Sequence, residues 1–181
     1  PVILVMGGSQ GARKINEMIL EALPFLLPEF ELIHQCGEKN YKQVLTEAEV
    51  MINEDLSNYY HLFSFLREKE LKSAYAIADI IVNRSGGNSI FEIAALGKPS
   101  ILVPLKESAQ NHQLKNAYTY AENGAALVIE ESNLTPHFFL EKLKFLMERP
   151  NEMEKMRLAA KEFSKPKAAK IIAQYLLDYL L

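Results

Sequence analysis

The sequence predicts a doubly wound α/β fold, with a mostly parallel six-stranded sheet and helices at its C-terminal end. Short apolar runs rich in β-branched residues alternate with longer segments of helical periodicity. Several of these runs are continuously apolar, which is typical of parallel strands buried on both faces. The loops that follow such strands share one edge of the sheet, where open α/β folds bind ligands.

Six strands and five intervening helices follow from this pattern. The expected strands are Val2–Met6, Glu31–Gln35, His61–Ser64, Ile80–Asn83, Ser100–Val103 and Ala126–Ile129. The expected helices between them are Ala12–Leu27, Asn40–Ala48, Lys69–Ala78, Asn88–Leu96 and Gln110–Asn123. Repeated strand–helix alternation of this kind favours one Rossmann-like sheet with helices on both faces.

The alternation ends after about Leu134, and helices fill the rest of the chain. Thr135 is a suitable N-cap, and Pro136 suits the first position of the helix that follows. A charged amphipathic helix is expected at Asn151–Phe163, and a last helix with an apolar face at Ala168–Leu181. That apolar face can pack on this domain or on a part of the protein that this chain lacks.

Composition indicates one ordinary globular domain across residues 1–181. Hydrophobic residues make up 49% and charged residues 24%, which argues against disordered and collagen-like classes. The formal net charge of −3 argues against a general nucleic-acid binder, and a single cysteine, Cys36, cannot form an internal disulfide. The chain opens on a strand without an initiator methionine or signal peptide, so we expect it to be part of a longer protein.

The first expected strand leads into a glycine-rich segment, Gly7-Gly8-Ser9-Gln10-Gly11-Ala12. Such a loop before a helix N-terminus can bind phosphate through backbone N–H groups, although a tight turn without a ligand is the plain alternative. A Walker A loop does not fit, because Lys14 is followed by Ile15. A dinucleotide fingerprint does not fit either, because the spacing is G-G-x-x-G and no acid follows the second strand before Glu38.

A second glycine loop follows the strand Ile80–Asn83. Backbone N–H groups of Gly87, Asn88 and Ser89 would point at a bound anion. Glu92 lies about one turn inside the next helix, where it either complements the helix N-terminus or accepts two vicinal hydroxyls of a ribose. Two anion sites on one sheet edge suggest a ligand with a diphosphate and a sugar.

A third polar segment follows the strand Ser100–Val103 and contains His112, Gln113 and Asn116. Amide side chains donate and accept hydrogen bonds together, which suits sugar hydroxyls. The alternative is a polar helix start on a solvated loop. One histidine without nearby ligands is a poor metal site, so no metal is expected.

These motifs together resemble the C-terminal half of the MurG family of glycosyltransferases. The resemblance is carried by the GGSQGAR run from Gly7 with Asn16, the AYAIAD run from Ala74, the segments Arg84-Ser85-Gly86 and Glu92 through Pro99, and His112-Gln113 with Asn116-Ala117. That family has the GT-B fold, belongs to glycosyltransferase family 28 and transfers N-acetylglucosamine (GlcNAc) in peptidoglycan synthesis. The resemblance covers nearly the whole chain.

The resemblance implies a role for each of these positions in binding the donor, UDP-GlcNAc. The residues beside the diphosphate would be Gly7, Gly8, Ser9, Gln10, Ser85, Gly86, Gly87, Asn88 and Ser89. Glu92 would hold the ribose, and the backbone of Phe65 and Leu66 would contact uracil. His112, Gln113 and Asn116 would contact the GlcNAc hydroxyls.

The resemblance further implies an inverting transfer of GlcNAc to lipid I, which forms lipid II, without a metal or other cofactor. The acceptor site and any general base would lie on an N-terminal domain that this chain lacks, so the chain alone is expected to bind donor without turnover. The full enzyme would be cytoplasmic, associated peripherally with the bacterial inner membrane. A separately encoded donor-binding subunit, or a related glycolipid transferase with another donor, remains an alternative.

Overall fold

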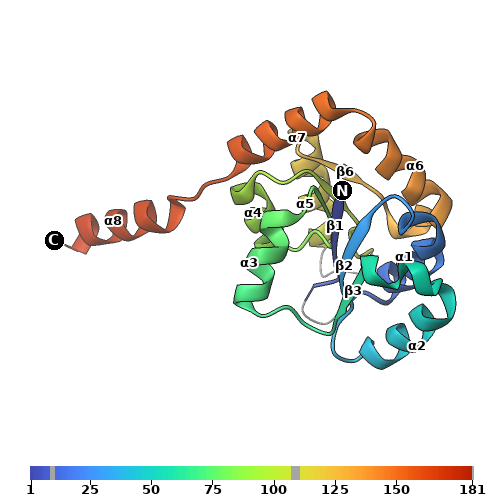
Figure 1. Ribbon diagram of the computed structural model, residues 1–181. Helices are drawn as coiled ribbons and strands as arrows, with labels where there is room; N and C mark the ends of the chain where they lie inside the picture. The colour runs from blue at the N-terminus through green and yellow to red at the C-terminus, as the bar shows by residue number, and fades with distance from the viewer. Residues whose placement is uncertain (9–10, 107–110, 181) are drawn as a thin grey trace.

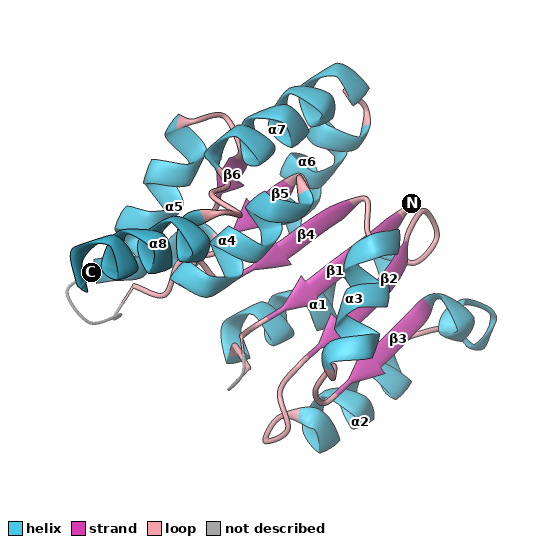
Figure 2. Cartoon of the chain, turned by 90° about the vertical axis from the view of Figure 1, so that its left-hand side faces the viewer, coloured by secondary structure: helices cyan, strands magenta, loops and turns pink. Residues whose placement is uncertain are grey.

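The computed structural model describes residues 1–8, 11–106 and 111–180. Its core is one six-stranded sheet in the order β3-β2-β1-β4-β5-β6, with every neighbouring pair parallel (Figure 2). The strands are β1 (Val2–Met6), β2 (Glu31–Gln35), β3 (Tyr60–Phe63), β4 (Ile80–Asn83), β5 (Ser100–Leu102) and β6 (Ala126–Val128). The predicted fold class is therefore confirmed, and each strand lies within a residue or so of its expected bounds.

The helices also follow the expected order. They are α1 (Arg13–Leu26), α2 (Tyr41–Met51), α3 (Glu68–Ile77), α4 (Gly87–Leu96), α5 (His112–Glu122), α6 (Pro136–Met147), α7 (Pro150–Phe163) and α8 (Ala168–Leu180). Two short 3-10 helices, η1 (Glu54–Tyr59) and η3 (Glu131–Asn133), connect larger elements and were not expected from the periodicity. The Thr135 hydroxyl accepts a hydrogen bond from the Phe138 N–H, which makes Thr135 the N-cap of α6 as predicted.

Helices cover both faces of the sheet (Figure 1). Ile3 and Val5 of β1 pack in one core cluster with α1, α2 and α6. Leu4 and Met6 point to the opposite face, into a second cluster with α3, α4 and α5. Because successive side chains of a strand alternate between faces, a strand buried on both must be continuously apolar, as β1 is.

The strand order places the carboxyl ends of β1 and β4 side by side at the centre of the sheet. The chain builds outward from β1 through β2 to β3, then returns to the other side of β1 to form β4. This reversal is the topological switch point of a doubly wound sheet, where adjacent loops diverge and leave a crevice. The two glycine-rich segments follow β1 and β4, so the topology sets them on either side of that crevice.

The last helix, α8, stands away from the rest of the domain (Figure 1). Its large apolar side chains are mostly exposed; they are Ile171, Ile172, Tyr175, Leu176, Leu177 and Tyr179. Within the described residues, no helix has both the length and the apolar character needed to cross a membrane.

Candidate functional site

The first glycine loop (residues 7–12) joins β1 to α1, and its glycines are required by the backbone itself. A Cβ on Gly7 would collide with the backbone nitrogen of Ala12. Gly8 and Gly11 have φ of 81° and 77°, and a Cβ on Gly11 would collide with the Cys36 carbonyl oxygen. The Gly11 N–H donates to the Gly8 carbonyl oxygen at 3.1 Å, closing the turn. The predicted diphosphate residues Ser9 and Gln10 lie outside the described residues.

A buried polar network packs beside this loop, around the Cys36 carbonyl oxygen that Gly11 approaches. The Asn16 amide donates to the Cys36 carbonyl oxygen at 3.0 Å and accepts from His34 Nε2 at 3.0 Å. The Tyr60 hydroxyl lies 2.9 Å from His34 Nδ1 and completes the network as a donor. Burial lowers the pKa of His34 to about 3, so the ring is neutral and serves to position its neighbours. Asn40 also donates to the Cys36 carbonyl oxygen, at 2.8 Å.

The second glycine loop (residues 84–89) joins β4 to α4. Gly86 is the N-cap of α4 with φ of −63°, and Gly87 begins the helix. A Cβ would meet nothing within 4 Å at Gly87 and only the Ser89 hydroxyl, at 4.0 Å, at Gly86. The first backbone N–H groups of a helix carry a partial positive charge and suit an anion. Gly87, Asn88 and Ser89 therefore lie at a helix N-terminus, and their contact with phosphate stays a prediction.

The second glycine loop is held by the start of α5. The Ser85 hydroxyl donates to the Gln113 carbonyl oxygen at 2.7 Å, and the Asn116 amide donates to the Ser85 carbonyl oxygen at 3.2 Å. The Gln113 side chain accepts from the Leu105 N–H at 3.1 Å. These bonds tie together the segments that follow β4 and β5. Gln113 and Asn116 thus have positioning roles that sequence reasoning missed, and their contact with GlcNAc stays a prediction.

A buried ion pair lies beside the second glycine loop. Arg84 Nη2 lies 2.6 Å from Glu131 Oε1, and the two side chains are 10% and 9% exposed. Arg84 Nη1 also donates to the Val103 carbonyl oxygen at 3.1 Å. The pair joins the ends of β4 and β5 to η3. Sequence reasoning missed Glu131, because only the folded sheet brings it beside Arg84.

The loops meet in one open cleft of about 710 Å³. Among the predicted site residues, Gly7, Gly8, Gly86, Ser89 and Gln113 line it. Its other lining residues include four cationic side chains and one carboxylate: Arg13 and Lys14 at the start of α1, Arg84, Lys106 and Glu131. The cleft therefore lies at the switch point and combines helix N-termini with cationic side chains, which is the electrostatic character that a diphosphate requires.

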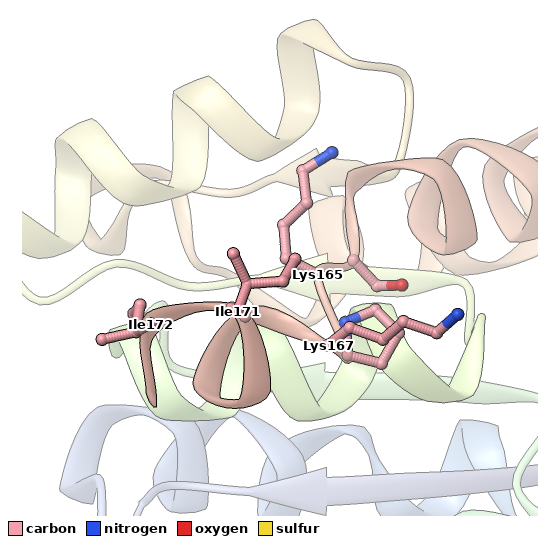
Figure 3. Close-up of a pocket in the computed structure, with 7 residues that line it drawn as sticks. Lys165, Lys167, Ile171 and Ile172 are labelled. Carbon is pink, nitrogen blue, oxygen red and sulfur yellow. The ribbon is translucent and has the colours of Figure 1, made fainter. Parts of the chain in front are cut away.

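A second hollow, of about 390 Å³, lies at the junction of α7 and α8 (Figure 3). Lys165, Lys167, Ile171 and Ile172 are among its lining residues. Its surface is chiefly apolar, and it contains none of the predicted site residues. It is therefore not the candidate donor site.

Glu92 lies on the exposed side of α4 and does not line the central cleft. The Tyr75 hydroxyl of α3 donates to Glu92 Oε2 at 3.2 Å and orients the carboxylate. Burial, followed by the nearby Glu92 charge, raises the pKa of Tyr75, so its hydroxyl stays a donor. The structure thus presents an oriented carboxylate one turn along α4, and its contact with ribose stays a prediction.

The predicted uracil segment lies between β3 and α3. Phe65 is 46% exposed, whereas Leu66 is buried. The Leu66 N–H donates to the Gln35 side-chain oxygen at 2.9 Å. That N–H is therefore already engaged within the domain, and the contact of the Phe65–Leu66 backbone with uracil stays a prediction. His112 begins α5 and is exposed.

The family comparison agrees with this geometry. The sequence profile of the glycosyltransferase family 28 C-terminal domain matches residues 2–172. The chain belongs to this family. Two curated family members are each named UDP-N-acetylglucosamine–N-acetylmuramyl-(pentapeptide) pyrophosphoryl-undecaprenol N-acetylglucosamine transferase. The protein of Clostridium kluyveri is 35% identical over 97% of this chain and 47% of its own length. That of Clostridium tetani is 38% identical over 82% of this chain and 39% of its own length.

Solved structures place this family 28 domain in the same fold. MurG of Acinetobacter baumannii matches with a TM-score of 0.83 and 27% identity, over 98% of this chain and 52% of that protein. A UDP-GlcNAc 2-epimerase from Neisseria meningitidis, bound to UDP-GlcNAc, matches with a TM-score of 0.65 and 21% identity, over 98% of this chain and 44% of that one. The second likeness concerns the fold alone. The chain thus spans about half the length of the relatives that it matches.

Proposed function

We propose that this domain binds UDP-GlcNAc as the donor-binding half of an inverting GlcNAc transferase that converts lipid I to lipid II. The observation that carries the proposal is the cleft at the switch point, where the glycine loops after β1 and β4 meet. The start of α4 and the cations Arg13 and Lys14 at the start of α1 would stabilise the diphosphate as UDP leaves, without a metal. The names of the family relatives support GlcNAc as the transferred sugar.

The donor would lie across the carboxyl ends of the strands. Its diphosphate would lie between residues 7–10 and 85–89, and Glu92 would accept the ribose hydroxyls. The backbone of Phe65 and Leu66 would contact uracil, with the Leu66 carbonyl oxygen accepting from the base. His112, Gln113 and Asn116 would contact the sugar. The segments named for uracil, diphosphate and sugar follow β3, then β1 and β4, then β5, which is the order in which these strands lie in the sheet.

Acceptor binding and membrane association would be properties of the full-length enzyme. The relatives' names specify an undecaprenol-linked acceptor, and a long lipid chain keeps such an acceptor in a membrane. We therefore place the full enzyme peripherally on the cytoplasmic face of the bacterial inner membrane. The acceptor-binding groups and any general base would come from another domain, so this chain by itself would bind donor without transferring it.

Isothermal titration calorimetry of the purified chain with UDP-GlcNAc tests the proposal. We expect saturable binding of UDP-GlcNAc. UDP should displace the bound UDP-GlcNAc, and UDP-glucose should displace it less well. Glu92→Gln should weaken binding about 10-fold, because the ribose loses a charged acceptor. Lys155→Ala, on the exposed side of α7, is the matched control and should leave affinity unchanged. Folded protein that binds neither UDP nor UDP-GlcNAc at millimolar concentration would refute the proposal.

A further inference from the structure

A buried glutamine lies at the carboxyl edge of the sheet, one strand away from the central cleft. Gln35 is the last residue of β2 and is 5% exposed. In the sheet register it pairs with Met6, which precedes the first glycine loop, and with Phe63, which precedes the predicted uracil segment. The Gln35 amide is therefore a polar group on the path between these two segments.

Within residues 1–8, 11–106 and 111–180, one half of this amide is used. Gln35 Oε1 accepts a hydrogen bond from the Leu66 N–H at 2.9 Å, and this bond fixes which end of the amide is the nitrogen. Nε2 has no hydrogen-bond partner in these ranges. It is not enclosed either, because the enclosed side-chain atoms that lack a partner there belong to Ser100, Tyr120 and Arg157. Buried polar side chains normally use their hydrogen-bonding groups, so Nε2 is a donor left open to a ligand.

The bond to Leu66 also restricts the direction in which Nε2 points. Leu66 is 3% exposed and packs in the same core cluster as Met6 and Ile33, which holds its backbone in place. An amide tied to that backbone has few rotamers left to lose when a ligand binds. Gln35 Nε2 and the segment of Phe65 and Leu66 are therefore held as one unit.

We propose that Gln35 is a specificity-determining residue, whose Nε2 group donates to the base of the nucleotide and selects uracil over cytosine. This inference rests on the proposed function, which places the base against the backbone of Phe65 and Leu66. Uracil presents a carbonyl oxygen, O4, at the position where cytosine presents an amino group. Nε2 donates to O4. Cytosine instead sets its amino group against the amide N–H groups, so donors on both sides lack an acceptor, which is a strong basis for rejection.

Calorimetric titration of the purified chain with UDP, CDP and pyrophosphate tests the inference. The wild type should bind UDP at least about 10-fold more tightly than CDP. Gln35→Glu keeps an acceptor for the Leu66 N–H but replaces the amide donor by a second acceptor. UDP affinity should fall about 10-fold in this variant while CDP affinity does not fall, so the preference is lost. Pyrophosphate has no base and should bind both proteins within about twofold at physiological salt, where the new charge is screened.

A second variant and a matched control complete the design. Gln35→Met keeps the side-chain length but removes both hydrogen-bonding groups, and should also lose most of the preference for UDP over CDP. Gln43→Met makes the same change on the exposed side of α2, where the amide bonds to Glu47, and should leave all three affinities unchanged. Thermal unfolding of each variant verifies that it is folded.

Three results would overturn the inference. Equal losses of UDP and CDP affinity in both variants, or failure of both variants to fold, would make Gln35 a structural residue. Wild-type protein that binds UDP and CDP equally would exclude base selection by Gln35 while leaving donor binding in place. Wild-type protein that binds neither UDP nor UDP-GlcNAc would overturn the proposed function as well.

Discussion

The two glycine loops that flank the cleft use their glycines differently. In the first loop, Gly7 and Gly11 have no room for a Cβ, and Gly8 and Gly11 have positive φ. In the second loop, Gly86 has φ of −63°, and the space beside Gly86 and Gly87 is open. The first loop therefore needs glycine in order to fold. The second loop does not need glycine in order to fold, so we infer that its glycines leave the backbone open to the approach of a ligand.

The supports of the two loops differ as well. A neutral hydrogen-bond network of Asn16, His34 and Tyr60 lies beneath the first loop. The second loop rests on an ion pair and on bonds from α5. Protonation of His34 would disturb the neutral network beneath the first loop, whereas the second loop is held partly by the charge pair of Arg84 and Glu131. Substitutions of the same kind should therefore affect stability and binding differently in the two loops.

The largest effect is expected from Gly11→Ala in the first loop. The new Cβ would occupy a positive-φ position and collide with the Cys36 carbonyl oxygen, which is backbone and cannot rotate away. We expect the free energy of unfolding to fall by about 3 kcal/mol or more. Urea denaturation followed by circular dichroism measures this. A loss below about 1 kcal/mol would show that the first loop does not need its glycine.

The next effect is the pH dependence of the network beneath the first loop. Burial lowers the pKa of His34 from 6.5 to about 3, so below about pH 6.5 the unfolded chain binds a proton that the folded chain does not. Stability should be intact above that pH and fall as pH drops, by about 1.4 kcal/mol per pH unit.

Denaturation curves at pH 7, 6 and 5 measure this fall. The control is His34→Gln, which should be less stable at pH 7 but should lose less stability toward pH 5, because it has no imidazole to protonate. Identical slopes for the wild type and the variant would mean that other groups dominate the acid response.

The third effect separates binding from folding in the second loop. Gly86→Ala places its Cβ in open space at an ordinary φ, so stability should change by no more than about 0.5 kcal/mol. Because Gly86 lines the cleft, the same methyl group should weaken UDP binding about 10-fold, by keeping the diphosphate from the backbone. Calorimetry and thermal unfolding on one protein sample give both values. Unchanged affinity would remove the second loop from the donor site.

The smallest effect is expected from Tyr75→Phe. This change removes the hydrogen bond that orients the exposed Glu92 carboxylate. We expect a loss of stability of about 0.5–1 kcal/mol and a few-fold loss of UDP affinity. The affinity for 2′-deoxy-UDP, which lacks one of the two vicinal hydroxyls, is the control and should change less. Equal losses for the two nucleotides would argue that Glu92 does not hold the ribose.

The sequence by itself determined the fold class, the order of the elements and the two glycine loops. A short, continuously apolar run such as β1 indicates a parallel strand that is buried on both faces. A glycine-rich turn before a helix is a local signal that can be recognised without knowing its distant neighbours. Ser85, Gln113 and Asn116 were also predicted as donor-binding residues, through the resemblance to the MurG family, and their contact with the donor stays a prediction.

Tertiary structure alone decided what those residues touch. It showed that Asn116 and Gln113 hold neighbouring segments, that the Leu66 N–H is engaged by Gln35, and that Glu131 lies against Arg84. The Leu66–Gln35 and Asn116–Ser85 contacts join residues 31 positions apart, and Glu131 lies 47 positions from Arg84, so these partners meet only when the sheet forms. Sequence patterns report local periodicity and turn chemistry, so a partner supplied by a distant strand end or a 3-10 helix leaves no trace in them.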